Sequence, residues 1–211
     1  MGTFHGSTTF VDFETTGLDE FKEQITQYAV ITYKEGKQTA RETGLVKLYG
    51  NHHVNEYIQN LTGLSDKILA EHGKDEQEVY NRLKEIMNLD KDPLIVGFNV
   101  NFDAGFLQQL SLKYDGKPLH AGFLDPLTIA REELNTDDLK AGKRLTQVCA
   151  HYGITVSHAH DAFSDVTALD ELTGAMIQEI DVSQYINKIG WLEKHGMFRT
   201  KLEGVTYFKQ G

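Results

Sequence analysis

Hydrophobic spacing divides the chain into a strand-rich first part and a second part in which strands alternate with helices. Apolar, β-branched and aromatic runs of strand length predict three strands at the start of the chain, over 8–13, 27–33 and about 39–48. The Glu35-Gly36 turn between the second and third runs is typical of a hairpin. We therefore expect the fold to open with an antiparallel meander.

After the meander, apolar residues recur at helical intervals instead. Val79, Leu83, Ile86 and Met87 lie on one face of an amphipathic helix predicted over 75–89. The continuous apolar run 94–98 is typical of a strand that is buried on both faces. The remaining predicted elements are helical turns at 54–58 and 66–71, helices at 104–114, 127–134, 145–152 and 162–180, and a strand at 120–124. This alternation predicts parallel βα crossovers.

Together these elements predict an α/β domain with a mixed five-stranded sheet, in which a meander is followed by βα units and helices cover both faces. We expect this domain to occupy residues 1–180. Residues 181–211 are expected to form a C-terminal helical extension packed on the same domain, with a helix at 185–195 and a strand around 205–208. The polar, glycine-containing stretch 138–144 predicts a loop.

Charge and composition narrow the class of protein. The formal charge of −10, from 31 acidic and 21 basic residues, argues against a protein that neutralises the phosphates of long duplexes. It permits an enzyme that handles a nucleic-acid end through bound metal ions, since the ions supply positive charge locally. Without a membrane-length apolar run or a signal-peptide core, and with one cysteine, Cys149, expected to be a buried thiol, we expect a cytoplasmic protein without a membrane partner.

Two acidic residues lie at the end of the first predicted strand. Asp12 and Glu14 are two positions apart, and strand side chains alternate, so both carboxylates leave the same face. Two carboxylates this close repel each other and are costly to desolvate, unless a divalent cation such as Mg²⁺ neutralises them. Taken alone, such a pair more often marks an edge strand with two solvated acids.

Two other helix starts carry candidate groups. Asp103 follows the buried run 94–98, where parallel α/β units form their ligand crevice, and Asp165 lies one turn into helix 162–180, just after His160. Taken singly, Asp103 could complement a helix dipole and His160 could cap a helix or lie at the surface. Together with Asp12 and Glu14 they predict a two-cation site for phosphoryl displacement, in which His160 takes the proton of the attacking water.

Three motifs agree with this interpretation in order and spacing: Val11-Asp12-Phe13-Glu14-Thr15-Thr16-Gly17, Asn99-x-x-Phe102-Asp103 and His160-x-Ala162-x-x-Asp165. Over about residues 8–180 the chain resembles the DEDDh 3′→5′ exonucleases, relatives of the proofreading subunit of bacterial replicases. The resemblance implies a ribonuclease H-like fold and two Mg²⁺ ions, replaceable by Mn²⁺, held by Asp12, Glu14, Asp103 and Asp165. It also implies release of nucleoside 5′-monophosphates from DNA 3′ ends, single-stranded ones above all, and a replicative polymerase or a second copy of the chain as partner.

The resemblance also implies a set of substrate-binding residues. Thr15, Thr16 and Gly17 would contact the terminal nucleotide, and Phe102 would line its pocket next to the motif residue Asn99. Within Leu61-Thr62-Gly63-Leu64, the side chains of Leu61, Thr62 and Leu64 would wedge against the last base. Phe98 departs from the family, because many members carry a polar residue before the motif asparagine.

Three alternatives stay open at this point. The substrate could be RNA, because these motifs do not report how the pocket treats a 2′-hydroxyl. The same fold could serve as a non-catalytic module that binds nucleic-acid ends or a protein partner. The pair His160-Asp161 also occurs in helical metal phosphohydrolases of the His-Asp type, which the strand-rich first half disfavours.

Overall fold

The computed structural model describes residues 6–134, 143–157, 161–191 and 200–209. Its main sheet has the strand order β3-β2-β1-β4-β5. The strands are β1 Ser7–Thr15, β2 Ile25–Lys34, β3 Lys37–Leu45, β4 Leu94–Val96 and β5 Gly122–Leu124. The first three pair antiparallel, whereas β4 pairs parallel with β1 and with β5. The predicted mixed five-stranded sheet is confirmed, and it excludes an almost entirely helical phosphohydrolase.

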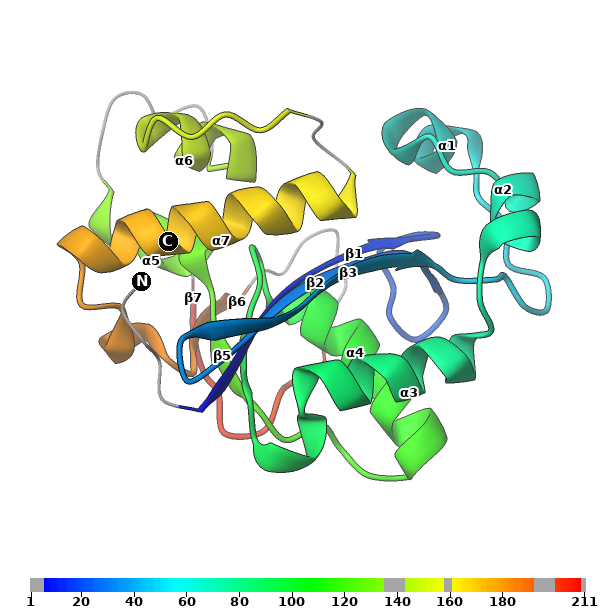
Figure 1. The fold of residues 1–211 in the computed structure, drawn as a ribbon, viewed down its shortest axis with the longest axis horizontal. Helices are drawn as coiled ribbons and strands as arrows, with labels where there is room; N and C mark the ends of the chain where they lie inside the picture. The colour runs from blue at the N-terminus through cyan, green and yellow to red at the C-terminus, as the bar shows by residue number, and fades with distance from the viewer. Residues whose placement is uncertain (1–5, 135–142, 158–160, 192–199, 210–211) are drawn as a thin grey trace.

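Helices cover both faces of this sheet (Figure 1). Helices α3 Glu76–Met87 and α4 Asn101–Asp115 pack on one face. Helices α5 Pro126–Glu133 and α7 Ala162–Glu179 pack on the other, and α6 Leu145–His151 packs on α7. Strand β1 supplies both cores, because Val11 and Phe13 face α3 and α4 whereas Phe10 faces α7. The central strand is therefore held between two hydrophobic layers.

The two short helices form a separate corner of the molecule. Helix α1 Glu56–Thr62 begins at the capping side chain of Asn55, and α2 Asp66–His72 begins at that of Ser65. Gly63 ends α1 with φ 75°, a left-handed conformation that suits glycine. A small buried cluster of Val54, Leu64 and Leu69 holds this corner together.

Aspartate side chains cap the N-termini of three helices, α3, α5 and α7. Asp75 accepts a hydrogen bond from Gln77 N at the start of α3, Asp125 accepts one from Leu127 N at α5, and Asp161 accepts one from Ser164 N at α7. Helix α4 differs, because the residue before it, Val100, makes no side-chain cap hydrogen bond. The aspartates suit these positions because a carboxylate satisfies free N–H groups and complements the helix dipole.

The helix predicted over 185–195 is wrong in the part of it that the structure describes. Residues Val182–Tyr185 form a 3-10 helix, and Lys188–Trp191 form strand β6, which pairs in parallel with β7 Thr206–Lys209. Ile186 is already extended, and Asn187 follows with φ 59° and accepts a hydrogen bond at its Oδ1 from Phe123 N on β5. The described extension is therefore a small second sheet docked beside β5, rather than a helix, although the predicted strand near 205–208 is confirmed.

Other predictions have mixed outcomes. Cys149 is buried and free, as expected. Most of the predicted loop at 138–144 lies outside the described residues, as does His160. Among the described helices, none combines the length and apolar character that a membrane span requires.

Two glycines should respond in opposite ways to substitution by alanine. A Cβ on Gly73 would lie 2.4 Å from Leu69 O and 2.7 Å from Lys47 N, whereas a Cβ on Gly174 within α7 would meet nothing within 4 Å. We expect Gly73→Ala to lower the free energy of unfolding by about 1–3 kcal/mol through overpacking. Gly174→Ala should raise it by about 0.5–1 kcal/mol. Urea unfolding of both variants checks the pair, and equal effects would contradict the packing described at Gly73.

Candidate active site

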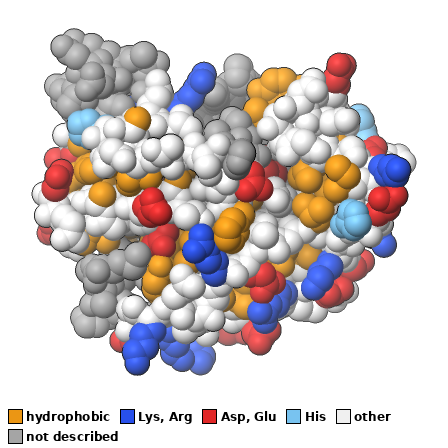
Figure 2. Space-filling view, turned by 45° about the horizontal axis from the view of Figure 1, so that its top comes forward, with side chains coloured by type: hydrophobic (Ala, Val, Ile, Leu, Met, Phe, Trp, Pro, Cys, Tyr) orange, Lys and Arg blue, Asp and Glu red, His pale blue; other side chains and the backbone are white. Residues whose placement is uncertain are grey.

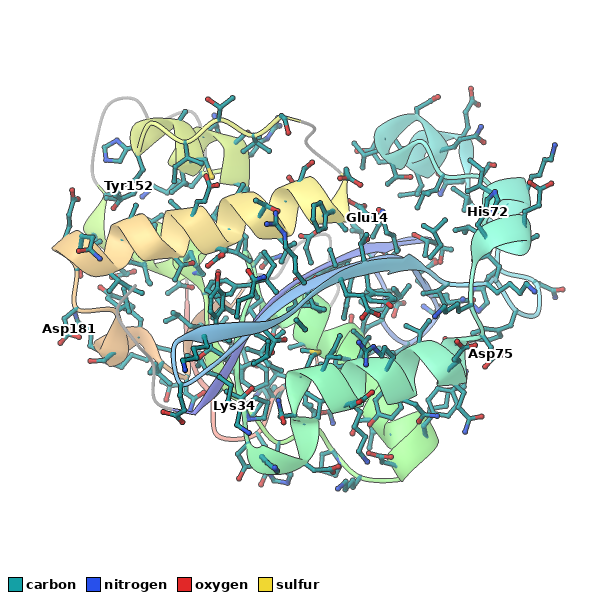
Figure 3. The ribbon with its side chains drawn as sticks, in the orientation of Figure 1. Glu14, Lys34, His72, Asp75, Tyr152 and Asp181 are labelled. Atoms are coloured by element: carbon teal, nitrogen blue, oxygen red, sulfur yellow. The ribbon has the colours of Figure 1, made fainter. Side chains whose placement is uncertain are left out.

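Three carboxylates meet between the end of β1 and the start of α7. Asp12 and Glu14 leave β1 on the face opposite to Val11 and Phe13, and Asp165 comes from the first turn of α7. One carboxylate oxygen from each lies within 4.8 Å of the others. Figure 3 shows Glu14 beside the N-terminal end of α7. The expected alternation along the strand thus places both of its acids against the helix that carries the third.

Asp103 reaches the same region from the first turn of α4. Its Oδ1 accepts a hydrogen bond of 2.9 Å from Phe13 N, the backbone amide between Asp12 and Glu14. The residue is only 3% exposed. Asp103 lies outside the group of three that share the 4.8 Å limit, but its negative charge raises the pKa of both Asp12 and Glu14. The structure thus brings together all four acids that the motifs single out.

Repulsion within this cluster is visible in the pKa values of its members. Burial, followed by the charges of Asp165, Asp103 and Asp161, raises the pKa of Glu14 from 4.5 to about 8. Burial and the neighbouring acids also hold the pKa of Asp12 well above its usual range. Carboxylates that retain protons near neutral pH are groups whose ionised form lacks compensating positive charge. A hard divalent cation supplies that charge, and carboxylate oxygens are the ligands it prefers.

Asp161 has a different role from Asp165, although both belong to the third motif region. Its carboxylate accepts hydrogen bonds of 3.1 Å from Ser164 N and Ser164 Oγ, and Gln27 Nε2 lies 3.4 Å away. Asp161 thereby caps α7 while its charge still acts on Asp12 and Glu14. The motif spacing selected Asp165, and the structure places Asp165 in the carboxylate cluster.

The turn after β1 is held by Glu23 and Gln24, two residues that the sequence did not single out. Thr16 Oγ1 donates to Glu23 Oε2 at 2.6 Å and accepts from Gln24 N at 3.0 Å. Thr15 Oγ1 donates to Gly17 O at 2.5 Å. A Cβ on Gly17 would lie 2.7 Å from the Glu23 side chain, so this position requires glycine or a shift of Glu23. The polar segment 19–24 has no motif that would have revealed this role.

A second supporting residue lies beneath the motif asparagine. Asn99 adopts φ 67°, and its backbone N donates a 2.9 Å hydrogen bond to Asp125 Oδ1. Asp125 is 2% exposed and also accepts hydrogen bonds from Leu127 N and Thr128 Oγ1. Phe102 packs against Phe106 with 5.1 Å between ring centroids. The sequence Asp125-Pro126 marks a helix start, but the bond to Asn99 could not be read from it.

The loop at the end of α1 is only partly available for the expected wedge. Leu64 is 8% exposed because it packs in the small cluster with Val54 and Leu69. Leu61 and Thr62 are partly exposed. The expected wedge role therefore has more support at Leu61 and Thr62 than at Leu64.

Basic side chains do not dominate the face drawn in Figure 2. Lysine and arginine side chains lie scattered there among acidic and apolar ones. This pattern agrees with the formal charge of −10. Among the described residues of this face, basic side chains therefore form no continuous surface of the kind that neutralises a row of phosphates.

Comparison with known proteins agrees with this geometry. A family model described as Exonuclease (RNase_T) matches residues 9–173. The PolC-type DNA polymerase III of Pediococcus pentosaceus is 28% identical over 160 residues, which cover 76% of this chain and 10% of the polymerase. The epsilon subunit of DNA polymerase III from Aquifex aeolicus is 26% identical over 175 residues, which cover 83% of this chain and 82% of that subunit.

A solved structure shares the fold. The zinc-bound complex of E. coli exonuclease I with single-stranded DNA matches with a TM-score of 0.72 and 19% identity, over 86% of this chain and 43% of that one. This likeness confirms the expected ribonuclease H-like fold. The chain spans about a tenth of the PolC-type polymerases that it matches, and less than half of exonuclease I.

The raised pKa of Glu14 predicts a pH-dependent stability in metal-free buffer. In the unfolded chain the Glu14 carboxyl ionises near pH 4.5, whereas in the folded protein it keeps its proton up to about pH 8. The free energy of unfolding should therefore fall as pH rises through this window. Glu14→Gln should show a shallower fall, because it removes one of the repelling charges. Thermal unfolding in chelator from pH 5 to 9 checks this, and equal slopes in both proteins would contradict it. Added Mn²⁺ should raise the melting temperature of the wild type more than that of the variant.

Proposed function

Because this chain belongs to the exonuclease family RNase_T, we propose that it is a metal-dependent 3′→5′ exonuclease acting on DNA. It hydrolyses the terminal phosphodiester, preferably at a single-stranded 3′ end, and releases a nucleoside 5′-monophosphate. The convergence of Asp12, Glu14 and Asp165 within 4.8 Å carries this proposal. Four acids from three separate elements repel one another, so their proximity destabilises the fold. The same proximity makes them suited to binding cations.

The residues present fit two divalent cations, Mg²⁺ or Mn²⁺ as a substitute. Asp12, Glu14 and Asp165 would hold one ion, and Asp12 would share a second with Asp103. The donor set is made of carboxylate oxygens, and the raised pKa values show that it lacks positive charge. When bound, the ions supply charge stabilisation to the attacking and leaving oxygens of an in-line displacement.

His160 is our candidate for the general base. It directly precedes Asp161, the cap of α7, whose charge acts on both Asp12 and Glu14. The third motif selects this histidine by its spacing to Asp165, and the unperturbed pKa of an imidazole suits proton transfer near neutral pH. The proton of the attacking water would pass to the imidazole as the water oxygen bonds to phosphorus. The bond between phosphorus and the 3′-oxygen of the preceding nucleotide would break, and that oxygen would take up a proton from solvent to leave a new 3′-hydroxyl end.

We propose that the turn after β1 binds the terminal nucleotide. Thr15, Thr16 and Gly17 follow directly after Glu14, and their own hydrogen bonds keep the turn in one shape. Asn99 and Phe102 would line the same pocket from the start of α4, and Leu61 and Thr62 would contact the last base, with a smaller part for the buried Leu64. An ordered turn binds with less loss of conformational entropy than a flexible one.

Support for DNA as the substrate comes from the relatives. One relative is a PolC-type DNA polymerase III and another is the epsilon subunit of a DNA polymerase III, and the matching exonuclease I structure holds single-stranded DNA. By the same reasoning we propose a replicative polymerase, or a second copy of the chain, as a protein partner. An assay with matched 3′-ended DNA and RNA oligomers, single- and double-stranded, distinguishes a DNA substrate from an RNA substrate when the products are resolved by length. Faster release of mononucleotides from RNA would overturn the choice of DNA.

Asp12→Ala should abolish metal-dependent shortening of a 5′-labelled oligonucleotide. We expect a loss of at least about 10³-fold, because several kcal/mol of charge stabilisation depend on the metal. The variant should remain folded, since it removes a repelled acid rather than a core contact. Asp181→Ala is the matched control, because Asp181 lies at the far end of α7 from Glu14 (Figure 3). Wild-type activity in Asp12→Ala, or binding without turnover in the wild type, would contradict the proposal.

His160→Ala should lower kcat by about 10²–10⁴-fold, the usual contribution of a general base. Oligonucleotide binding in chelator should be unchanged, because the imidazole acts on the water rather than on the DNA. Imidazole added to the buffer should restore part of the rate. A variant with the wild-type rate would remove His160 from the mechanism without affecting the metal assignment.

A further inference from the structure

The C-terminal segment, residues 200–207, returns to the elements that carry the acids. Thr200 N and Thr200 Oγ1 donate hydrogen bonds of 2.7 and 3.0 Å to Glu20 Oε1. Glu20 belongs to the loop after β1 and is 4% exposed. It also lies against Gly105 of α4, where a Cβ would be 3.3 Å from its carboxyl group. Thr200 therefore contacts the protein where the loop after β1 meets α4.

A second contact joins this segment to the first residue of α4. Tyr207 Oη donates a 2.9 Å hydrogen bond to Asn101 Oδ1 and accepts one of 2.9 Å from Leu202 N. Asn101 is 3% exposed, so its amide oxygen needs a partner within the protein. Leu202 is 4% exposed and belongs to the core beside α3 and α4. The hydroxyl of Tyr207 thus lies between the tail and the start of the helix.

The start of α4 lacks the acidic cap that begins α3, α5 and α7, so contacts from outside the helix matter more there. Asp75, Asp125 and Asp161 cap their own helices, whereas Val100 gives α4 no side-chain cap. Two residues after Asn101 comes Asp103, whose Oδ1 accepts the hydrogen bond from Phe13 N. A shift of the first turn of α4 would therefore move Asp103 relative to Asp12 and Glu14 on β1.

We propose that Tyr207 is a positioning residue, which holds the first turn of α4 through Asn101 and so sets the place of Asp103 beside β1. Residues 200–207 lie beyond the part of the chain that the family model matches. The inference rests on the proposed function wherever activity is read, but the geometry concerns cation binding as well. Displacements of about 1 Å are enough to cost a metal-dependent site much of its rate.

Tyr207→Phe tests this inference, with Tyr80→Phe as the matched control. Tyr80 Oη donates a 2.8 Å hydrogen bond to Asp115 Oδ2, at the other end of the same helix. Each variant removes one tyrosine hydroxyl that holds α4, but only Tyr207 holds the end with Asp103. We expect Tyr207→Phe to lower kcat on single-stranded DNA and to weaken Mn²⁺ binding, each by about 10- to 100-fold, with KM for DNA unchanged. Tyr80→Phe should leave kcat and Mn²⁺ affinity unchanged.

Calorimetric Mn²⁺ titration of the full chain keeps this inference separate from the proposed function. Wild-type protein that binds Mn²⁺ but degrades no oligonucleotide would overturn the proposed function, and the titration of the two variants would still decide the role of Tyr207. Equal kcat and Mn²⁺ affinity in Tyr207→Phe and Tyr80→Phe would overturn the positioning role while leaving the exonuclease intact.

A second substitution covers the case in which Tyr207→Phe fails to fold. Asn101→Ala removes the acceptor and leaves the tyrosine in place, so it should lower Mn²⁺ affinity by a similar factor. If both changes act through one hydrogen bond, the double variant should be no worse than either single one. Fully additive losses, or Asn101→Ala with wild-type Mn²⁺ affinity, would contradict the inference.

Discussion

Electrostatic repulsion among closely spaced carboxylates is the constraint on which the rest of the structure depends. Asp12, Glu14 and Asp165 would separate if their side chains were free, yet their oxygens lie within 4.8 Å. The central strand and the long helix α7 hold them in place through a hydrophobic layer that contains Phe10, Val166 and Leu169. Apolar packing thus offsets a local repulsion that bound cations, or protons in their absence, relieve.

The acids in and beside the site fall into two kinds that differ in their partners. Asp103 and Asp125 accept hydrogen bonds from backbone amides, and these bonds join separate segments of the chain. Asp12 and Glu14 instead lie among other acids, and the charges of these neighbours add to burial in raising their pKa values. The first kind fixes the geometry of the site, whereas the second creates its demand for metal. A protein with a net charge of −10 can therefore hold a nucleic-acid end without a broad basic surface.

The C-terminal segment, beyond the residues that the family model matches, also supports the geometry of the site. Its strands β6 and β7 form a second small sheet, and Tyr207 brings this sheet to the start of α4. Helix α4 carries Asp103 but lacks a side-chain cap of its own. Contacts from a distant part of the chain therefore stabilise the one helix start of the site that has least local support.

Periodicity and spacing in the sequence determined the five strands, the main helices and the acids of the site, because strand alternation and helical repeats are local properties. They could not determine that Asp103 bonds to Phe13 N, that Glu23 supports the turn after β1, that Thr200 bonds to Glu20, or that Leu64 is buried. They also predicted a helix at 185–195, where pairing with β7 and docking on β5 produce a strand. Each of these features arises from contacts between residues far apart in the chain, which only the tertiary structure brings together.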